Sequence, residues 1–517
     1  MAMIQVKNAG SIGVIKDLSV HELPLGAWTD ALNIRFLDGY AYQFIGHGAV
    51  YGTPLAAPQY VLPVTVGGVR SWIYASAAKQ HVVQNVAGAP VHTDISHVTP
   101  RAGVVNQWTG FVFGGIPILN TGDTATVPMY WDQNLAHKFL DLPAWPAGTY
   151  CKALRGYKNF IIALGVTKAG VTYGYMVKWS HPAEAGALPV SWDIADATKD
   201  AGEYDLSDGQ DPIIDGLQLR NSFMVYKESS IWRMDYTGGV YVFQFSKVLG
   251  TSGAMNRNCI VELDGYHLVL TGQDVIIHDG QSANSVLDKV TRRYLMQNID
   301  VNSRAKCFAF KNPFMNEVFI CYPSIGSTMC DRAMVWNYVD KTVSFRTLPN
   351  LAHAAVGTVD NSLGGTWGAD DSPWNSDLTA WNGPDFTPDS ARVIMASGDT
   401  KLFLLDAAAS FDGVAPTSYL ERRGLSFDVP ERIKLVRSIR PRITGNIGDT
   451  VIIKVGGSDD PYADPVYGAP MTHIIGQTIS NDLMLSARYI AIRFESGTAA
   501  QWRLDSFTID AEPQGLW

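Results

Sequence analysis

The feature that most constrains this chain is a long series of short apolar runs separated by turn residues. The runs are rich in Val, Ile, Phe and Tyr, and clusters of Gly, Asp, Asn and Pro divide them; examples are residues 70–77, 108–114, 159–167, 222–228, 267–272, 317–323 and 401–406. Runs of this length and composition predict β-strands rather than helices. The clearest helical segment is Asp288 to Gln297. We therefore predict an all-β chain with less than about 15% helix, against about 30–35% in ordinary globular proteins.

The runs also form a weak repeat. Several units close on an apolar residue followed by Asp or Asn, at positions 131–132, 192–193, 234–235, 278–279, 336–337 and 405–406. Four-stranded propeller blades repeat at about 40 to 50 residues, and insertions lengthen individual blades. The repeat predicts a β-propeller of about six to eight blades over residues 56–415. The alternative is a set of unrelated antiparallel sheets joined by ordinary Asp-Gly turns.

Two flanking regions differ from this middle part. Residues 416–517 carry strand-like runs in which apolar residues alternate with Arg, Lys or Asp, a pattern typical of a β-sandwich with one wet face on each sheet. Residues 1–55 are rich in loops and too short to bury a core of their own. We expect this N-terminal segment to pack on the C-terminal sandwich, so that both chain ends form one platform domain.

Composition limits the environment of the chain. Only 17% of the residues are charged, against about 25% in an ordinary domain, which favours a surface partly covered by other protein. The net charge of −9 leaves no basic footprint for sequence-independent nucleic-acid binding. The five cysteines are odd in number and never spaced as CxxC, which favours a reducing cytoplasm over a disulfide framework or a zinc site. We find no secretory signal or membrane-spanning run and expect no membrane anchor.

Motifs for catalysis are scarce. The chain contains no GxxxxGK[ST], GxGxxG, HExxH or GxSxG motif, and its histidines lack metal-ligand spacing. We therefore expect no enzyme activity, cofactor or resident metal. One acidic cluster is a weak candidate for Ca²⁺, although turn formation is the favoured interpretation of its residues: Asp205, Asp208, Asp211 and Asp215.

Two groups of residues are candidates for a protein interface. Trp367, Trp374 and Trp381 recur every seven residues in a stretch whose Gly, Pro and paired Asp exclude a stable helix. They either bury against a blade or anchor a partner, since Trp is enriched at interface hot spots. The second group is basic and could contact a neighbouring ring, the alternative being a solvated strand face: Arg422, Arg423, Arg437, Arg440 and Arg442.

Four stretches carry a resemblance to a known family: residues 13–41, 225–245, 264–281 and 486–510. With them, the whole chain resembles the tail-nozzle family of short-tailed bacteriophages (podoviruses), also called packaged-DNA stabilisation, tail tubular or head-closure proteins. Each motif is a loose pattern of aromatic, Gly and Asp residues.

The resemblance implies a non-enzymatic structural protein of the virion tail, made in the bacterial cytoplasm. Its subunits would form a homohexameric ring below the portal and the adaptor, or head-tail connector. Tail fibre or tailspike proteins would be further partners, and DNA would pass through the ring at ejection without specific binding. An acidic channel wall suits that role because it repels phosphates.

Two other functions stay open. A receptor-binding or glycan-cleaving propeller tail protein would have paired carboxylates in a cleft if it cleaved glycans. A surface scaffold that binds host proteins would need no such pair.

Overall fold

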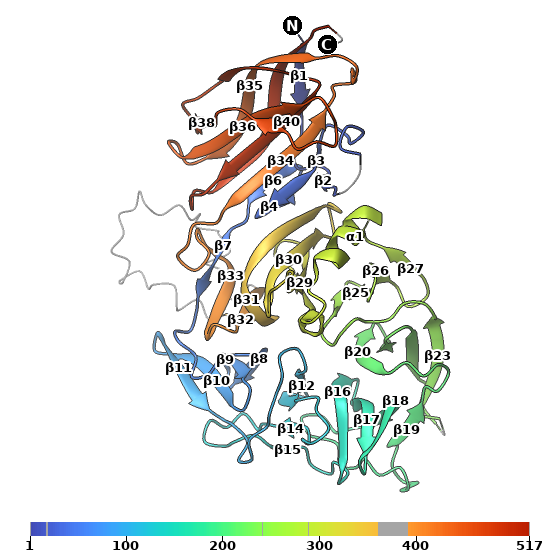
Figure 1. The fold of residues 1–517 in the computed structure, drawn as a ribbon. Helices are drawn as coiled ribbons and strands as arrows, with labels where there is room; N and C mark the ends of the chain where they lie inside the picture. The colour runs from blue at the N-terminus through green and yellow to red at the C-terminus, as the bar shows by residue number, and fades with distance from the viewer. Residues whose placement is uncertain (1, 17–18, 240, 288, 360–390, 516–517) are drawn as a thin grey trace.

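The computed structural model describes residues 2–16, 19–239, 241–287, 289–359 and 391–515. Strands make up 53% of the chain and helices 2%, which confirms the predicted all-β class. Figure 1 shows two parts, a ring of small sheets and a smaller pair of sheets beside it that holds both chain ends. The ring is a β-propeller, as the sequence repeat predicts.

The first five blades are four-stranded antiparallel sheets that follow one another along the chain. In each, the first strand is innermost and the fourth lies at the rim. The strands of blades 1 and 2 are β8 (Tyr60–Val66), β9 (Val69–Ala75), β10 (Gln80–Val86), β11 (Ala89–Asp94), β12 (Thr109–Phe113), β13 (Ile116–Asn120), β14 (Met129–Tyr130) and β15 (Leu140–Asp141). Those of blade 3 are β16 (Thr149–Tyr157), β17 (Phe160–Lys168), β18 (Val171–Trp179) and β19 (Gly202–Asp205). Those of blades 4 and 5 are β20 (Ile213–Leu219), β21 (Ser222–Lys227), β22 (Ile231–Tyr236), β23 (Phe243–Leu249), β24 (Ile260–Leu263), β25 (Tyr266–Leu270), β26 (Val275–His278) and β27 (Ala283–Ser285).

Blades 6 and 7 share one strand. The long β31 (Val343–Thr358) pairs with β30 through its first half and with β32 through its second half, so it is the rim of blade 6 and the innermost strand of blade 7. The N-terminal β7 (Gly46–Ala49) pairs with β33 and supplies the fourth strand of blade 7. The remaining strands are β28 (Phe308–Asn312), β29 (Glu317–Tyr322), β30 (Cys330–Asn337), β32 (Ala391–Ser397) and β33 (Lys401–Ala408). The propeller therefore has seven blades, and a strand from before blade 1 closes it.

A helix stands between blades 5 and 6. It is α1 (Lys289–Asn298), followed by the short 3-10 helix η1 (Arg304–Lys306). Its position confirms the helical segment expected at residues 288–297. No helix among the described residues reaches the length and apolarity that crossing a bilayer requires.

The second part is a β-sandwich built from both ends of the chain. One sheet has the order β39 (Asn481–Ala487), β35 (Lys434–Gly445), β41 (Trp502–Pro513), β6 (Tyr40–Gln43) and β5 (Ile34–Leu37), and β1 (Ala2–Val6) also pairs with β41. The other has the order β37 (Val466–Tyr467), β36 (Thr450–Ser458), β40 (Tyr489–Ser496), β34 (Ser418–Leu425) and β4 (Asp30–Leu32), and β38 (Met471–Ile474) also pairs with β36. The strands β2 (Gly13–Val14) and β3 (Ala27–Trp28) form a small parallel pair. The N-terminal segment thus enters both parts: β1, β4, β5 and β6 join the sandwich, and β7 joins the propeller.

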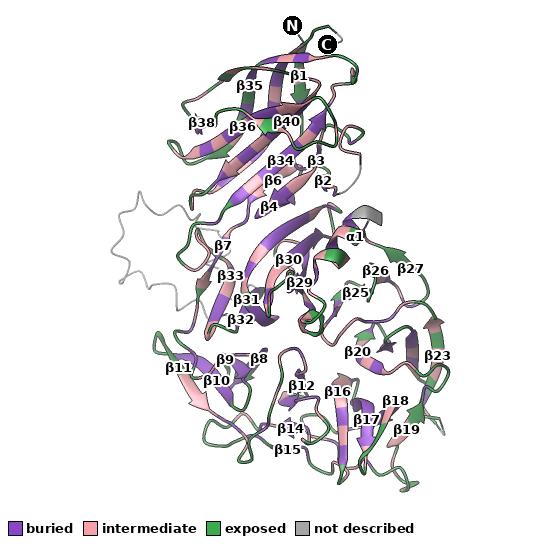
Figure 2. Ribbon diagram, in the orientation of Figure 1, coloured by how far each residue is buried: buried purple, intermediate pink, exposed green. Residues whose placement is uncertain are grey.

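The apolar core runs without a break from the sandwich into the propeller. One cluster of buried side chains joins Trp28 and Phe494 of the sandwich to Val318 and Trp336 of blade 6. Figure 2 shows buried residues along the strands of both parts and exposed residues mainly at turns and loops. Because shared apolar burial stabilises an interface between domains, the two parts pack as one continuous unit.

The ring closes tightly between blades 7 and 1. Gly357 lies on the second half of β31, where an added Cβ would stand 2.6 Å from Cβ of Pro63 and 2.7 Å from the ring of Trp72. Because a proline ring and a buried indole cannot give way cheaply, we expect Gly357→Ala to lower the free energy of unfolding by about 1–3 kcal/mol. Gly497→Ala is the matched control, since an added Cβ there meets nothing within 4 Å. Urea unfolding of both variants checks this, and equal stabilities would contradict the tight closure.

Candidate protein interface

The two predicted groups of interface residues have different outcomes. Trp367, Trp374 and Trp381 lie outside the described residues. The five arginines are all described, and they divide into one buried residue, one locally paired residue and three that share an exposed face.

Arg422 is not a surface residue, which corrects its assignment as an interface candidate. It is 1% exposed, and its guanidinium donates to the backbone carbonyls of Val20 at 2.7 Å and Leu23 at 2.8 Å. The cause is a β-bulge between Arg422 and Leu425, where Gly424 has φ +71°. Burial lowers the pKa of Arg422 to about 10. The side chain therefore fixes the N-terminal loop to β34.

Arg423 is engaged within its own chain. It forms an ion pair with Asp464 at 2.6 Å and a second, closer contact with Glu421. Glu421 is itself buried and accepts from Arg493 at 2.7 Å. Arg423 thus belongs to a charge network across the second sheet of the sandwich.

Arg437, Arg440 and Arg442 lie on the outer face of β35. The intervening Val436, Ile439 and Pro441 point into the sandwich. Arg437 pairs with Glu512 on the neighbouring β41 at 2.5 Å. Arg440 and Arg442 are exposed, and no ion pair or side-chain hydrogen bond among the described residues involves either.

Strand register shows what surrounds these arginines. Met3, Asp510, Ser438 and Asp482 form one row across the sheet, and Gln5, Thr508 and Arg440 form the next. Met484 of the edge strand β39 is 83% exposed. We call this surface, defined by Met3, Arg437, Arg440, Arg442 and Met484, the arginine face. Arg and Met are enriched at the centres of protein interfaces, so its composition suits a protein partner.

The acidic residues gather at another place. Residues 181–215 contain nine Asp and Glu and only one basic residue, Lys199, which accounts for −8 of the chain's net −9. Most of this charge lies on the rim of blade 3 and the turn before blade 4. Figure 1 places β19 of this region near one end of the molecule and β35 near the other.

Three carboxylates of the weak Ca²⁺ candidate in this region form ion pairs with lysine or arginine side chains of the chain itself. Asp211 pairs with the buried Lys227 at 2.8 Å, Asp215 with Arg155 at 2.7 Å, and Asp208 with Lys247 at 3.2 Å. No group of three potential metal ligands occurs in the part of the chain that the structure describes. These three carboxylates therefore have separate partners and no common centre, and Asp205 is exposed at the end of β19.

Polar side chains from different blades meet near the axis of the propeller. Arg155 on β16 binds Asp215 on β20 and also donates to the Asn258 side chain at 3.0 Å. Asn258, before blade 5, donates to Asn106, before blade 2, at 3.1 Å. Asn106 in turn donates to the carbonyl of Cys307, before blade 6, at 2.7 Å. Five blades are thus joined across the axis by hydrogen bonds.

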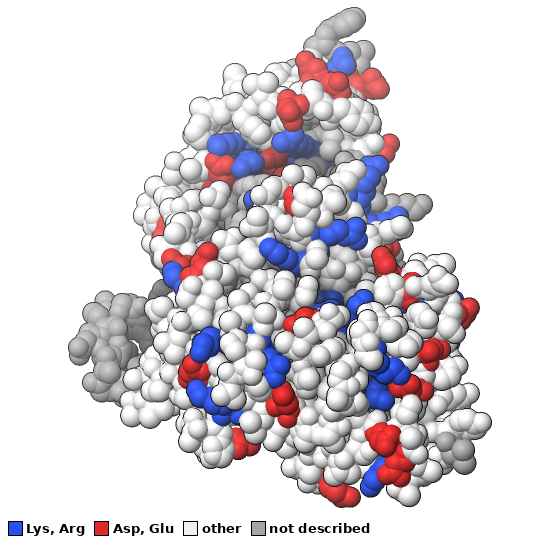
Figure 3. Space-filling view, turned by 60° about the horizontal axis from the view of Figure 1, so that its bottom comes forward, with Lys and Arg blue, Asp and Glu red and all other residues white. Residues whose placement is uncertain are grey.

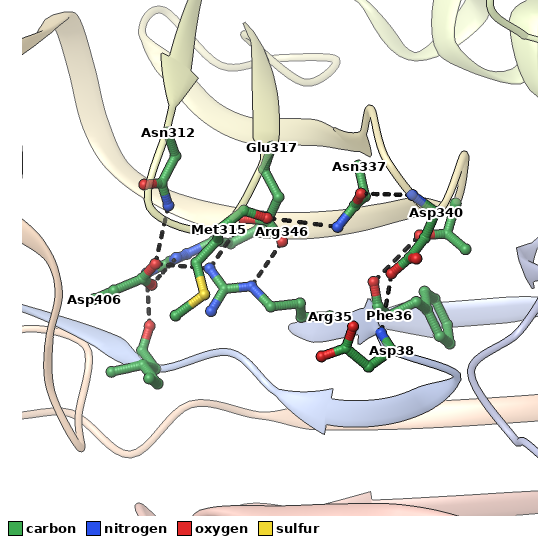
Figure 4. A network of polar contacts seen from close by, with 12 residues as sticks. Arg35, Phe36, Asp38, Asn312, Met315, Glu317, Asn337, Asp340, Arg346 and Asp406 are labelled. Carbon is green, nitrogen blue, oxygen red and sulfur yellow. Dashed lines mark hydrogen bonds and ion pairs between the residues drawn. The ribbon is translucent and has the colours of Figure 1, made fainter. Parts of the chain in front are cut away.

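A second polar network joins the sandwich to the propeller (Figure 4). Arg35 on β5 donates two hydrogen bonds to Glu317 on β29, at 2.7 and 3.0 Å, and one to Asp406 at 2.7 Å. Asp406 also accepts from Arg346 on β31 at 3.1 Å. All four side chains are almost completely buried. Burial opposes the charge of the Arg35 guanidinium, but Asp406 and Glu317 outweigh it and raise its pKa.

None of four cavities on the described surface is lined by two carboxylates. A cavity of about 530 Å³ on the sandwich contains one carboxylate, Asp30, which is already bound to Lys16. A groove of about 420 Å³ between the two parts is lined by Leu37, Tyr42, Met315 and Trp502 and holds no carboxylate. On the face shown in Figure 3, Lys and Arg are interspersed with Asp and Glu.

Comparison with known proteins finds only distant structural likeness. No protein-family model matches the chain, enzyme families included, and no curated protein matches it. Similar solved structures include Sqt1 of Saccharomyces cerevisiae (TM-score 0.38, 9% identity, 66% of this chain and 82% of that chain). Others are the Pan2 WD40 domain of Neurospora crassa (0.37, 7%, 70% and 94%) and a fungal alcohol oxidase of the AA5 family in complex with copper (0.42, 9%, 89% and 93%). At these identities a likeness concerns the fold alone.

Proposed function

We propose that this chain is a structural subunit of the tail nozzle of a short-tailed bacteriophage. In this proposal six copies form a ring below the portal and adaptor in the virion tail, and tail fibres or tailspikes are its further partners. The ring closes the DNA channel of the particle and conducts DNA at ejection. The proposal starts from the resemblance of the chain, from end to end, to the nozzle family.

The structural observation that carries the proposal is the buried connection between the propeller and a sandwich made from both chain ends. The buried pairs of Arg35 with Glu317 and Asp406 fix one part to the other, and a continuous core surrounds them. A ring that withstands the passage of DNA needs subunits of this kind, with no hinge between their parts. Because polar side chains of five blades are joined near the propeller axis, the DNA channel in this proposal lies on the ring axis, between subunits.

The alternative of a glycan-cleaving propeller is less well supported. A glycosidase needs one carboxyl group free to protonate the leaving group and a second one near it. Among the described residues, the buried carboxylates of Asp215, Glu317, Asp406 and Glu421 are each held by arginine, and Asp510 is the one further buried carboxylate. Receptor binding without cleavage needs no such pair and stays the second candidate.

Electron microscopy of the purified full chain tests the proposal. We expect class averages of a closed ring with a central hole wide enough for duplex DNA, and a reconstruction with more Asp and Glu than Lys and Arg on the hole's wall. A protein that remains monomeric at every concentration, or a ring with a basic wall, would contradict the nozzle assignment. Binding of the monomer to host surface glycans would favour the receptor-binding alternative.

A further inference from the structure

The rim of blade 3 carries a loop that is shaped for contact with another protein. Residues 180–201, which we call the acidic loop, connect β18 to β19. Its Trp192 is buried against Trp145, with ring centroids 4.7 Å apart. Trp179 donates its indole N–H to the carbonyl of Asp200 at 2.9 Å, and His181 donates its backbone N–H to Ser191 at 2.9 Å. The loop therefore has a fixed conformation, which lowers the entropy lost on binding.

What this loop presents to solvent is apolar and acidic. Val190 is 68% exposed and Ile194 50% exposed. Glu184, Asp193 and Asp200 are exposed beside them. Among the described residues, no Lys or Arg lies within ion-pair distance of these three carboxylates.

The arginine face has the complementary composition. Arg440 and Arg442 have no acidic partner among the described residues, and Met3 and Met484 stand exposed on the same side of the sheet. The face is not purely basic, because Asp482 and the Arg437–Glu512 pair lie on it. A mixed surface of this kind suits a protein partner with exposed carboxylates better than a nucleic-acid backbone, which would meet those acids as well.

We propose that the arginine face of one copy binds the acidic loop of the next copy. This inference rests on the proposed ring and names the two surfaces that would close it. Because the two surfaces differ and lie near opposite ends of the molecule, the contact is heterologous, and repeating it produces a ring when the rotation between copies closes. The acidic loop itself carries four carboxylates, Glu184, Asp193, Asp196 and Asp200, against the single Lys199.

Charge reversal of one surface at a time tests the contact. The variants are Arg440→Glu with Arg442→Glu, and Asp193→Lys with Asp200→Lys, each in the full chain. Like charges facing one another cost several kcal/mol, so each double variant is expected to weaken assembly about 100-fold or more and to sediment as a monomer. The controls reverse exposed charges outside both surfaces: Arg432→Glu and Glu228→Lys should leave the ring intact.

Mixing the two double variants gives the decisive result. The reversed arginine face of one variant then meets the reversed acidic loop of the other, and the remaining natural pair is also complementary. We expect rings of alternating variants to form in the mixture and not from either variant alone. This recovery also excludes misfolding as the cause of the monomers.

The possible failures are distinguishable. If both double variants still form rings, the contact lies elsewhere, and the inference is wrong while the nozzle proposal stands. If the unmutated chain is monomeric, both fail. If the arginine variant keeps its ring but loses binding to a fluorescently labelled DNA duplex in anisotropy measurements, the arginine face binds nucleic acid and the inference is wrong.

Discussion

Arg35→Met is expected to lower the free energy of unfolding by about 3–5 kcal/mol, since it leaves a buried charge without its partner. The Glu317 carboxylate would lose both of its hydrogen bonds from the guanidinium, and Asp406 would lose one of its two arginines. Neither carboxylate can reach water, because both side chains are almost completely buried. Urea unfolding followed by tryptophan fluorescence measures the effect.

The reason for the loss can be tested with a second substitution. Arg35→Met combined with Glu317→Met removes the orphaned charge, so the double variant should recover part of the stability that the single variant loses. Arg432→Met removes an exposed arginine of the same sandwich and should change the stability by less than about 0.5 kcal/mol. A double variant less stable than Arg35→Met would show that the pair stabilises the fold beyond satisfying Glu317.

The same variant reports on the connection between the two parts. Arg35 stands on β5 of the sandwich, whereas Glu317 and Asp406 belong to blades 6 and 7. We expect the Arg35→Met variant to unfold in two calorimetric transitions, whereas the unmutated chain should unfold in one. Limited proteolysis should then cut first between the sandwich and the propeller.

Much of the propeller is predictable from the sequence because each blade repeats a local pattern. The unit ends such as Met234-Asp235, His278-Asp279 and Trp336-Asn337 lie at or beside the end of a blade's third strand. The closure is not predictable in this way. It depends on β7, which precedes blade 1 by sequence and pairs with β33 more than 350 residues later, and on β31, which serves two blades without a turn.

The arginines show a second limit of pattern reasoning. Alternation along β35 correctly places Arg440 and Arg442 on one face but would put Arg437, three residues before Arg440, on the other. A bulge between Val436 and Ser438 brings Arg437 to the same face. The same alternation cannot show that Arg422 points inward, since a bulge at Gly424 changes the face of the strand. A bulge depends on the pairing partner, which one strand's sequence does not contain.

The histidines show a third limit of reasoning from sequence patterns. By spacing they look scattered, yet Tyr226 on blade 4 joins two of them from blade 5. Its hydroxyl lies 2.6 Å from Nδ1 of His267 and 2.7 Å from Nε2 of His278. His267 donates from Nε2 to the Gln218 carbonyl at 2.9 Å, and the Gly280 N–H donates to Nδ1 of His278 at 3.2 Å. Each imidazole ring therefore needs one unprotonated nitrogen that accepts a hydrogen bond. All of these hydrogen bonds can form only when His267 and His278 are both neutral.

Acidification below pH 6.5 is expected to destabilise the protein steeply, well before its carboxylates titrate. Burial lowers the pKa of His267 to about 3 and that of His278 to about 4. Burial, helped by a nearby arginine, lowers the pKa of His47 and His353 to about 3. In the unfolded chain all four take up a proton near pH 6.5, so the folded state binds fewer protons from there down to about pH 4. Stability is therefore fully present above pH 6.5 and falls as the pH decreases.

The expected slope is large and assignable to individual residues. Each such histidine contributes roughly 1.4 kcal/mol per pH unit, and the four together roughly 5 to 6, once the pH is well below 6.5. Asp94 and Asp211, whose pKa lies below the ordinary value, add to the loss only below about pH 4.

Urea unfolding from pH 7.5 to pH 4.5 measures the slope. His353→Gln, whatever its effect on stability at neutral pH, should reduce the slope by roughly 1.4 kcal/mol per pH unit because glutamine does not titrate. A flat profile for the unmutated chain would contradict the prediction, because it would mean that the buried histidines take up protons near pH 6.5 in the folded protein just as they do in the unfolded chain.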